Sequence, residues 1–430
     1  MKQEMKRLRK KLNKWKKNWK KNWNKKVKKK YKKRINKRIN KIKKSKPVRL
    51  GYRGIFGLVG KLPKKEIIVF ESFLGKQYSC NPRAIYELLQ KQDREYTYYW
   101  SIDHRFKSRF EEHGVQTIQR FTVKWFVVMM RAKYWVFNSR LPKWIPKPAD
   151  TVYLQTWHGT PLKKLALDMD EVLMPGTTTE MYKRNFVAEA SRWNYLVSPN
   201  SYSTDIFKRA FDFDETTQTM LETGYPRNDY LFHYTEEDVR AIKERLQLPE
   251  DKKVILYAPT WRDNEYHFIG KYKFAIQMDL DRMREELGDD YVIVMRLHYL
   301  VSDKLDLTGY EDFAVDGSNY PDIRDLYIIS DLLITDYSSV MFDYGVLKRP
   351  MIFYVYDIES YRDQLRGFYF DFEKDAPGPL VKTTEDMIYY VKRADTIRTE
   401  HQEQVEWFEE TFHSLEDGYA SDRVIQQVFD

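Results

Sequence analysis

Short apolar segments recur along the chain in two series, and polar turns bound each of them. Segments of helical character separate these runs. Continuous apolar runs of this length are typical of strands that are buried on both faces of a parallel sheet. The alternation therefore predicts an α/β fold. The candidate strands are residues 66–73, 96–102, 134–139, 151–157 and 193–200 in the first series, and 253–261, 291–298, 331–339 and 350–357 in the second.

The number of candidate strands and the chain length indicate two domains of this kind. A chain of 430 residues exceeds the roughly 250–300 residues at which a single core stops growing. Residues 235–248 (TEEDVRAIKERLQL) read as a helix with Thr235 as its N-cap, and Gly224 and Pro226 break regular structure just before it. We therefore expect Rossmann-like domains at residues 48–232 and 233–430.

The first 47 residues form a basic arm of different composition. Residues 1–50 hold 26 of the 75 Lys and Arg residues and a single acid, Glu4. Helical spacing of an apolar stripe in a basic segment predicts an amphipathic helix on an anionic membrane surface. A solvated tail and an arm that binds nucleic acid or another polyanion are the alternatives. The stripe consists of Leu8, Leu12, Trp15, Trp19, Trp23, Val27, Tyr31, Ile35, Ile39 and Ile42.

Several classes of protein lose support from the sequence. Residues 1–50 have no continuous apolar core of the kind found in a signal peptide, and no apolar run reaches the ~18–20 residues that span a bilayer. Cys80 is the single cysteine, which excludes an internal disulfide, and we expect it to serve in packing. The chain has no HExxH, CxxC, Walker, GxGxxG or GxSxG pattern, which disfavours metal hydrolases, P-loop NTPases, dinucleotide oxidoreductases and serine hydrolases.

The run TVYLQTWHGTPLKKL (151–165) predicts a strand, a tight loop and a helix. Thr160 suits the N-cap of that helix and Pro161 its first turn, so His158 and Gly159 would precede a helix N-terminus that attracts anions. A histidine at this place can accept a hydroxyl proton at neutral pH. We therefore regard His158 as the candidate catalytic base, with Gly159 and Thr160 in contact with substrate. The alternative is a histidine that only satisfies backbone groups at a turn.

Two further strand ends carry cations. Arg296 and His298 end the strand at 291–298 and are one residue apart, which places them on one face and suits a phosphate clamp. Thr260 and Arg262 follow the strand that starts at residue 253. Ligands of open α/β sheets bind beyond the carboxyl ends of the strands, so we expect all four residues at the substrate.

The run DLLITDYSSVMFDYG (331–345) predicts another passage from strand to helix. Asp336, Ser338 and Ser339 suit the start of that helix, where N–H groups bind a diphosphate. Asp343 follows about one helical turn later and could reach a sugar hydroxyl. Ordinary capping without a ligand is the alternative.

Taken in order, these runs resemble the CDP-glycerol glycerophosphotransferase family, the teichoic acid primases and polymerases of Gram-positive bacteria. The resemblance covers roughly residues 65–400. It rests on SFLGKQYSCNPRAIYELL, LQTWHGTPLKKL, TGYPRNDYL, ILYAPTWRD, MRLHYL, ITDYSSVMFDYGVLKRPMIFY and YRDQLRGFYFDF.

The resemblance implies a GT-B-like fold, in which two Rossmann-like domains face a cleft, with CDP-glycerol on the second domain and the acceptor entering from the first. It implies catalytic roles for His158 of the HGT motif and His298 of the RxH motif, and donor phosphates at Ser338 and Ser339. The expected reaction moves glycerol phosphate from CDP-glycerol to a hydroxyl of a lipid-linked acceptor and releases CMP.

The remaining expectations concern partners and place. No cofactor is required, and a divalent metal is compatible with the reaction. The arm at residues 1–47 would hold the protein peripherally on the cytoplasmic face of the membrane, without nucleic acid as a partner. A CDP-ribitol transferase or capsule polyol-phosphate polymerase would show the same motifs. An inactive polyanion-binding protein is the alternative from a different class.

Overall fold

The computed structural model describes residues 54, 60, 62–172, 177–260, 266–268, 271–272, 276–297, 305–361 and 367–430. The predicted amphipathic arm, residues 1–47, lies outside the described residues, and so do Arg262 and His298. No helix within the described ranges has both the length and the apolar character that crossing a bilayer demands.

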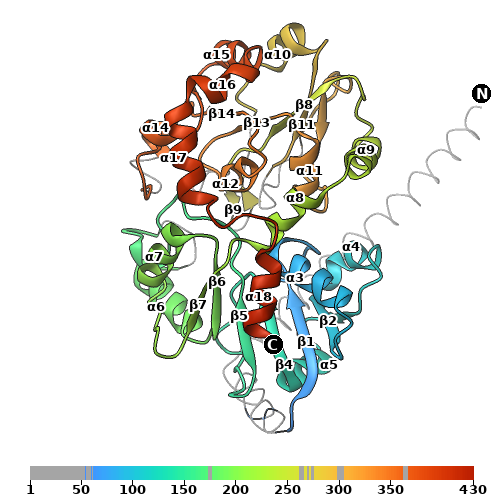
Figure 1. The fold of residues 1–430 in the computed structure, drawn as a ribbon, viewed down its shortest axis with the longest axis vertical. Helices are drawn as coiled ribbons and strands as arrows, with labels where there is room; N and C mark the ends of the chain where they lie inside the picture. Colours follow the sequence, from blue (N-terminus) through green and yellow to red (C-terminus); the bar gives the residue numbers. More distant parts are fainter. Residues whose placement is uncertain are drawn as a thin grey trace, which may run out of the picture. The chain divides into compact units, whose positions relative to one another are not determined.

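The first domain contains a sheet of seven parallel strands in the order β3-β2-β1-β4-β5-β6-β7 (Figure 1). Its central strand β1 is buried from Ile67 to Glu71, because helices cover both faces of the sheet. The strands are β1 (Lys65–Glu71), β2 (Thr97–Ile102), β3 (Thr117–Gln119), β4 (Ala132–Phe137), β5 (Val152–Gln155), β6 (Tyr195–Ser198) and β7 (Thr219–Glu222).

The helices of the first domain follow the strands of its sheet. Capping side chains start several of them: Thr122 accepts a hydrogen bond from the backbone of Trp125, and Asn200 accepts one from that of Ser203. The helices and 3-10 turns are α3 (Cys80–Lys91), η1 (His104–Phe106), α4 (Ser108–Glu111), α5 (Val123–Arg131), η2 (Ala166–Asp168), α6 (Thr179–Ala190) and α7 (Ser201–Ala210).

The second domain repeats this topology with six parallel strands in the order β12-β11-β8-β13-β14-β15. Numbered from the first strand of each sheet, the strands of both sheets begin with the Rossmann order 3-2-1-4-5-6. In this arrangement the strand order reverses next to the first strand, and a crevice for ligands opens there at the carboxyl ends of the strands. The strands are β8 (Lys253–Tyr257), β11 (Tyr291–Met295), β12 (Ala314–Asp316), β13 (Leu332–Thr335), β14 (Met351–Tyr354) and β15 (Leu380–Val381); β9 (Tyr266–Phe268) and β10 (Lys271–Tyr272) form a separate hairpin.

Helices also cover the second sheet, and two apolar clusters, one containing Val254 and Leu256 and the other Ile255 and Ile293, fill its two faces. The alternation of neighbouring residues between the clusters follows from the two-residue period of a strand. The helices are η3 (Pro226–Asp229), α8 (Tyr230–His233), α9 (Glu236–Arg245), α10 (Leu280–Leu287), α11 (Ile323–Ile329), α12 (Val340–Gly345), α13 (Ile358–Ser360), α14 (Phe372–Asp375), α15 (Thr384–Val391), α16 (Ala394–Glu400), α17 (Gln402–Phe412) and α18 (Ala420–Val428).

The α/β prediction with two parallel sheets is confirmed, and each of the nine candidate strands overlaps a strand of the structure. The start of α9 is also as predicted, since Thr235 caps the helix and forms a reciprocal capping box with Asp238.

The last helix departs from the expected division of the chain at residue 233. Helix α18 lies over the first sheet in Figure 1, and its apolar residues Val424, Ile425 and Val428 belong to the same buried cluster as Ile68 and Leu89 of the first domain. The reason is that α18 presents one apolar face, which the first domain covers. The chain therefore passes between the domains twice, once through residues 223–235 and once through residues 413–419.

Candidate active site

His158 lies in a strained turn directly after β5. The preceding residue, Trp157, has a φ of 49°, in the left-handed region that bulky side chains avoid. Its buried indole packs against Phe207 and Phe211, and its backbone N–H donates to the Gln155 side chain at 3.0 Å. These contacts stabilise the left-handed backbone conformation of Trp157, which by itself costs about 1–3 kcal/mol.

The imidazole of His158 has a defined orientation. Its Nδ1 lies 2.7 Å from the carbonyl oxygen of Asn138, the residue that follows β4. Because a carbonyl only accepts hydrogen bonds, Nδ1 carries the proton and Nε2 is left unprotonated in the neutral ring. Asn138 is itself fixed, since its Oδ1 accepts from the backbone N–H of Phe73 at 2.8 Å. The Phe73 ring also makes a T-shaped contact with the imidazole.

The surroundings of His158 favour the neutral ring. The His158 side chain is exposed and lines a cavity, while its Nδ1 edge faces the protein. Burial lowers the pKa of His158 to about 4, the Arg227 and Arg140 cations lower it further, and the bond to Asn138 opposes the shift. Solvent in the cavity offsets part of this burial, but the direction leaves His158 neutral at pH 7 and able to accept a proton.

Two cavities meet at His158. One has a volume of about 220 Å³ and extends towards Cys80, Arg227 and Arg296. The other, of about 270 Å³, extends along Gly159 to Leu165. Both are lined by His158, Pro259, Ser338 and Ser339, which come from both domains. Of the predicted site residues, His158, Ser338 and Ser339 line both cavities. Gly159, Thr160 and Thr260 line the larger one, and Arg296 and Asp343 line the smaller one.

The prediction of a helix that starts at Thr160 and Pro161 is wrong. Residues 161–165 are irregular, and the next element is the short turn η2. The segment pairs with the second domain instead: the backbone of Lys164 donates to Gly367, that of Tyr369 donates to Leu162, and Lys163 forms an antiparallel bridge with Phe368. The backbone groups are satisfied by this long-range pairing, so a helix dipole does not act on His158.

Gly159 lies against the second domain. A Cβ atom at this position would be 3.2 Å from Oγ of Ser339, closer than most side chains tolerate. Glycine at 159 therefore allows the His158 loop to approach the residue that precedes α12.

Asp336 has a different role from the predicted one. The prediction that it caps the next helix is wrong, because its Oδ1 accepts from the backbone N–H of Thr260 at 2.8 Å. Asp336 thus joins the carboxyl ends of β13 and β8. Helix α12 does begin directly after Ser339 as predicted, but Ser339 gives it no side-chain cap, and Oγ of Ser338 is 3.5 Å from the N–H of Val340.

Arg296 lines the cavity, but its Nη1 does not face a substrate. That nitrogen donates to the carbonyl oxygens of Gly317, Ser318 and Tyr320 at 2.7, 2.9 and 2.7 Å. The guanidinium therefore holds the loop that follows β12, which corrects the predicted phosphate clamp for this part of the side chain. The predicted partner His298 and the predicted Arg262 lie outside the described residues.

Asp343 is buried in an ion pair and also lines the smaller cavity, so its contact with a sugar hydroxyl stays a prediction. Its Oδ1 lies 2.7 Å from Nη2 of Arg227, and both side chains are less than a tenth exposed. Burial disfavours both charges, but the carboxylate holds the pKa of Arg227 well above its usual value. No role was predicted for Arg227, although this residue belongs to the TGYPRNDYL run.

Two further observations concern possible metal ligands and Cys80. Within the described ranges, no group of three or more His, Cys, Asp or Glu side chains is arranged to hold a metal ion. Cys80 is buried as expected, but its Sγ also accepts from Nη1 of Arg227 at 3.4 Å and lines the smaller cavity.

Curated relatives align with most of this chain. A teichoic acid poly(glycerol phosphate) polymerase of Bacillus subtilis (strain 168) is 54% identical over 396 residues, which are 90% of this chain and 53% of that protein. A protein of the same name from Bacillus spizizenii is 55% identical over 381 residues, 88% of this chain and 95% of that protein. The chain thus spans about half of the first relative and nearly all of the second.

A solved structure has the same fold. The wall teichoic acid polymerase TagF, crystallised as a histidine-to-asparagine variant soaked with CDPG, superposes with a TM-score of 0.80 at 46% identity and covers 88% of this chain and 92% of that one. The family described as CDP-glycerol:poly(glycerophosphate) glycerophosphotransferase matches residues 56–430. The resemblance seen in the motif series is therefore confirmed, and the chain belongs to this glycerophosphotransferase family.

Proposed function

We propose that the protein transfers glycerol phosphate from CDP-glycerol to a hydroxyl of a lipid-linked acceptor and releases CMP. The observation that carries this proposal is the geometry of His158. The Asn138 carbonyl binds its Nδ1 proton, and the ring lines both cavities that also contain Ser338 and Ser339. A neutral imidazole beside two hydroxyls suits proton removal next to a bound diphosphate.

The proposed reaction is a direct in-line displacement. Nε2 of His158 takes the proton of the acceptor hydroxyl as its oxygen attacks the β-phosphorus of CDP-glycerol. The bond between that phosphorus and the bridging oxygen breaks, and CMP leaves with the bonding electrons. Phosphoryl transfer depends mainly on positioning and charge neutralisation, so no covalent intermediate with the protein is needed.

The donor phosphates would be bound from the second domain. We assign the hydroxyls of Ser338 and Ser339 to the diphosphate, together with Thr260 at the neighbouring strand end. Arg262 and His298, which the sequence analysis also selected, would supply positive charge. The proposal requires no cofactor and is compatible with a divalent metal at the diphosphate.

Glycerol phosphate is favoured over ribitol phosphate as the transferred group. Both relatives described above are named for poly(glycerol phosphate), and they are more than half identical to this chain. A transferase that uses CDP-ribitol, or a capsule polymerase, remains the alternative within the same chemistry.

The acceptor is proposed to lie at the cytoplasmic face of the membrane, with residues 1–47 holding the protein peripherally on anionic lipid. The support is the basic and tryptophan-rich composition of that segment. A lipid-linked polymer would then reach the cleft from the surface on which the enzyme is held.

The test is CMP release from a panel of CDP-glycerol, CDP-ribitol and nucleotide sugars with a lipid-linked acceptor, followed by mass analysis of the lipid product. We expect release from CDP-glycerol, and we expect His158→Ala to abolish it. His104→Ala is the matched control, because the His104 side chain is 68% exposed and outside both cavities.

Other outcomes would select other functions. Release from CDP-ribitol alone would change the donor but keep the mechanism. Near-normal turnover by His158→Ala would refute the proposal that His158 is the general base. Salt-sensitive binding of nucleic acid without CMP release from any donor would indicate the inactive polyanion-binding protein.

A further inference from the structure

We propose that Arg227 is a positioning residue that sets the distance between His158 and the donor-binding serines. This inference rests on the proposed function, because it concerns the same site. Arg227 belongs to η3, in one of the two segments that pass between the domains.

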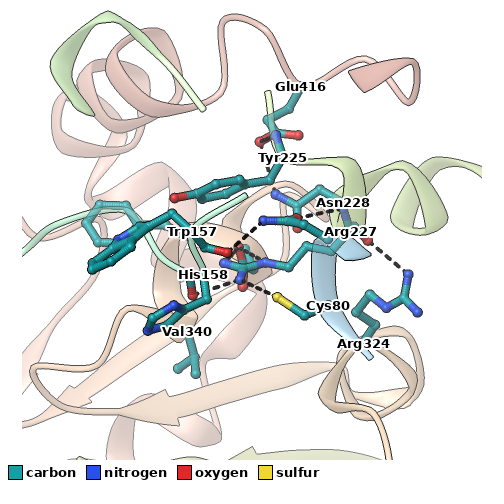
Figure 2. A network of polar contacts seen from close by, with 12 residues as sticks. Cys80, Trp157, His158, Tyr225, Arg227, Asn228, Arg324, Val340 and Glu416 are labelled. Carbon is teal, nitrogen blue, oxygen red and sulfur yellow. Dashed lines mark hydrogen bonds and ion pairs between the residues drawn. The ribbon is translucent and has the colours of Figure 1, made fainter. Parts of the chain in front are cut away.

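One guanidinium contacts both domains. Nη1 of Arg227 donates to the carbonyl oxygen of His158 at 2.8 Å, while Nη2 and Nε contact Oδ1 of Asp343 at 2.7 and 3.2 Å. Figure 2 shows the Arg227 side chain directed towards His158, with Cys80 close to both residues. Asp343 is the fourth residue of α12, and Ser338 and Ser339 directly precede that helix.

Arg227 is itself fixed on both sides. Its backbone N–H donates to Oδ1 of Asn81 at 3.0 Å, and its carbonyl oxygen accepts from Nη1 of Arg324 at 3.3 Å. Nδ2 of Asn81 in turn donates to the carbonyl oxygens of Thr156 and Trp157 at 2.9 and 3.3 Å. The base-bearing turn is therefore tied to η3 through Arg227 and through Asn81.

Arginine is the residue that this arrangement requires. Its planar guanidinium offers five N–H donors in fixed directions, so it can bond to a carbonyl and a carboxylate at once. The ammonium of a lysine keeps the charge but lacks this fork. The His158 turn and the segment before α12 also approach each other at Gly159 and Ser339. A Cβ atom at position 159 would lie 3.2 Å from Oγ of Ser339, so the Ser339 side chain would have to move. Small displacements of reacting groups can lower a rate about 100-fold.

The experiment compares Arg227→Lys and Arg227→Gln in the full-length protein, with kcat and KM for CDP-glycerol measured by CMP release. We expect kcat to fall about 10- to 100-fold in both, with KM for CDP-glycerol nearly unchanged, because the serines remain in place.

The pH profile separates positioning from a general loss of structure. Arg227 of η3 and Arg140, which follows β4, are the cations that act on His158, and the Asn138 carbonyl is its hydrogen-bond partner. Removal of one cation in Arg227→Gln should move the acid limb of kcat/KM to higher pH. Arg227→Lys keeps the charge and should leave that limb near its wild-type position.

Arg83→Lys is the matched control. Nη1 of Arg83 on α3 pairs with Asp322 before α11 at 3.1 Å, so this change also weakens an ion pair between the domains, but Arg83 lines neither cavity at His158. We expect its kcat and pH profile to match the wild type.

Three results would decide the matter. Folded Arg227→Lys with wild-type kcat, or a loss confined to KM, would overturn the proposal. If the Arg227 variants do not fold, Asp343→Asn and Gly159→Ala replace them, and unchanged kcat in both would equally overturn it. No CMP release by the wild type would instead refute the proposed function.

Discussion

Nδ1 of His158 and the carbonyl oxygen of Asn138 lie 2.7 Å apart, and this contact fixes which ring nitrogen carries the proton. A backbone carbonyl accepts a hydrogen bond at any pH, so Nδ1 keeps its proton and titration of the ring occurs at Nε2. The orientation of the base is therefore set by the end of β4, a neighbouring strand, and not by a carboxylate partner.

The first prediction concerns pH. Burial and the cations of Arg227 and Arg140 hold the pKa of His158 below its usual 6.5, and the neutral ring is the active form. Activity should therefore be complete above this pKa and lost only as the pH falls through it. We expect kcat/KM for CDP-glycerol to be nearly constant between pH 6 and 8, where an ordinary histidine with a pKa of about 6.5 would titrate. A midpoint of the acid limb at 6.5 would contradict the lowered pKa.

The second prediction concerns Asp336, which joins Thr260 to β13. Asp336→Ala leaves the Thr260 N–H without this acceptor, so we expect the free energy of unfolding to fall by about 1–3 kcal/mol. The KM for CDP-glycerol should also rise, because Thr260 and Ser338 would move apart. Urea denaturation and donor titration measure the two effects.

Asp331→Ala is the control for that experiment. Oδ2 of Asp331 accepts from the backbone N–H of Val254 at 2.7 Å, at the amino ends of the same two strands. We expect a similar loss of stability with unchanged donor binding. If both variants weaken donor binding equally, Asp336 has only a structural role.

The third prediction concerns Glu416, a partly buried acid in one of the two segments that pass between the domains. Its Oε1 accepts from the backbone of Tyr225 and from Nδ2 of Asn228, as Figure 2 shows. Burial raises the pKa of Glu416 from its usual 4.5 to about 8. A raised pKa in the folded state gives stability that is complete below the unfolded value and lost as the pH rises towards the folded value.

Glu416→Gln removes this titration and keeps the acceptor oxygen. The Tm of the variant relative to the wild type should therefore increase between pH 5 and pH 8. A difference in Tm that does not change with pH would show that Glu416 titrates normally.

The fourth prediction concerns the arm. Deletion of residues 1–47 should release the protein from liposomes that contain anionic lipid, while turnover on a soluble acceptor analogue is retained. The deleted segment holds most of the basic charge of residues 1–50 and all of the tryptophan stripe. Unchanged liposome sedimentation would contradict the interfacial helix. Loss of turnover on the soluble analogue would show that the arm is also part of the enzyme's body.

Much of the architecture was predictable because central parallel strands are apolar throughout. Residues 66–73 and 253–261 overlap β1 and β8, the first strand of each sheet in chain order. The strands β3, β7, β12 and β15 were missed, since each lies at a sheet edge and has only two to four residues. Short edge strands are specified by their neighbours in space and leave only a weak local pattern.

The sequence allowed several residues of the site to be predicted, but not most of the contacts that these residues make. The strand-end rule selected His158, Ser338 and Ser339, which do meet. The helix after Thr160 was wrong because long-range pairing with residues 367–369 outweighs local propensity. Arg227 was overlooked because its partner Asp343 is 116 positions away in the chain, and the local sequence around an arginine does not indicate such a distant partner.

The return of α18 to the first domain has a consequence for biosynthesis. A ribosome completes all seven strands of the first sheet by residue 222, but Val424, Ile425 and Val428 fill part of the same core. The nascent first domain must therefore remain unfinished, with an apolar surface uncovered, while some two hundred further residues are translated. The domain whose synthesis starts first is completed only when the second has already been made.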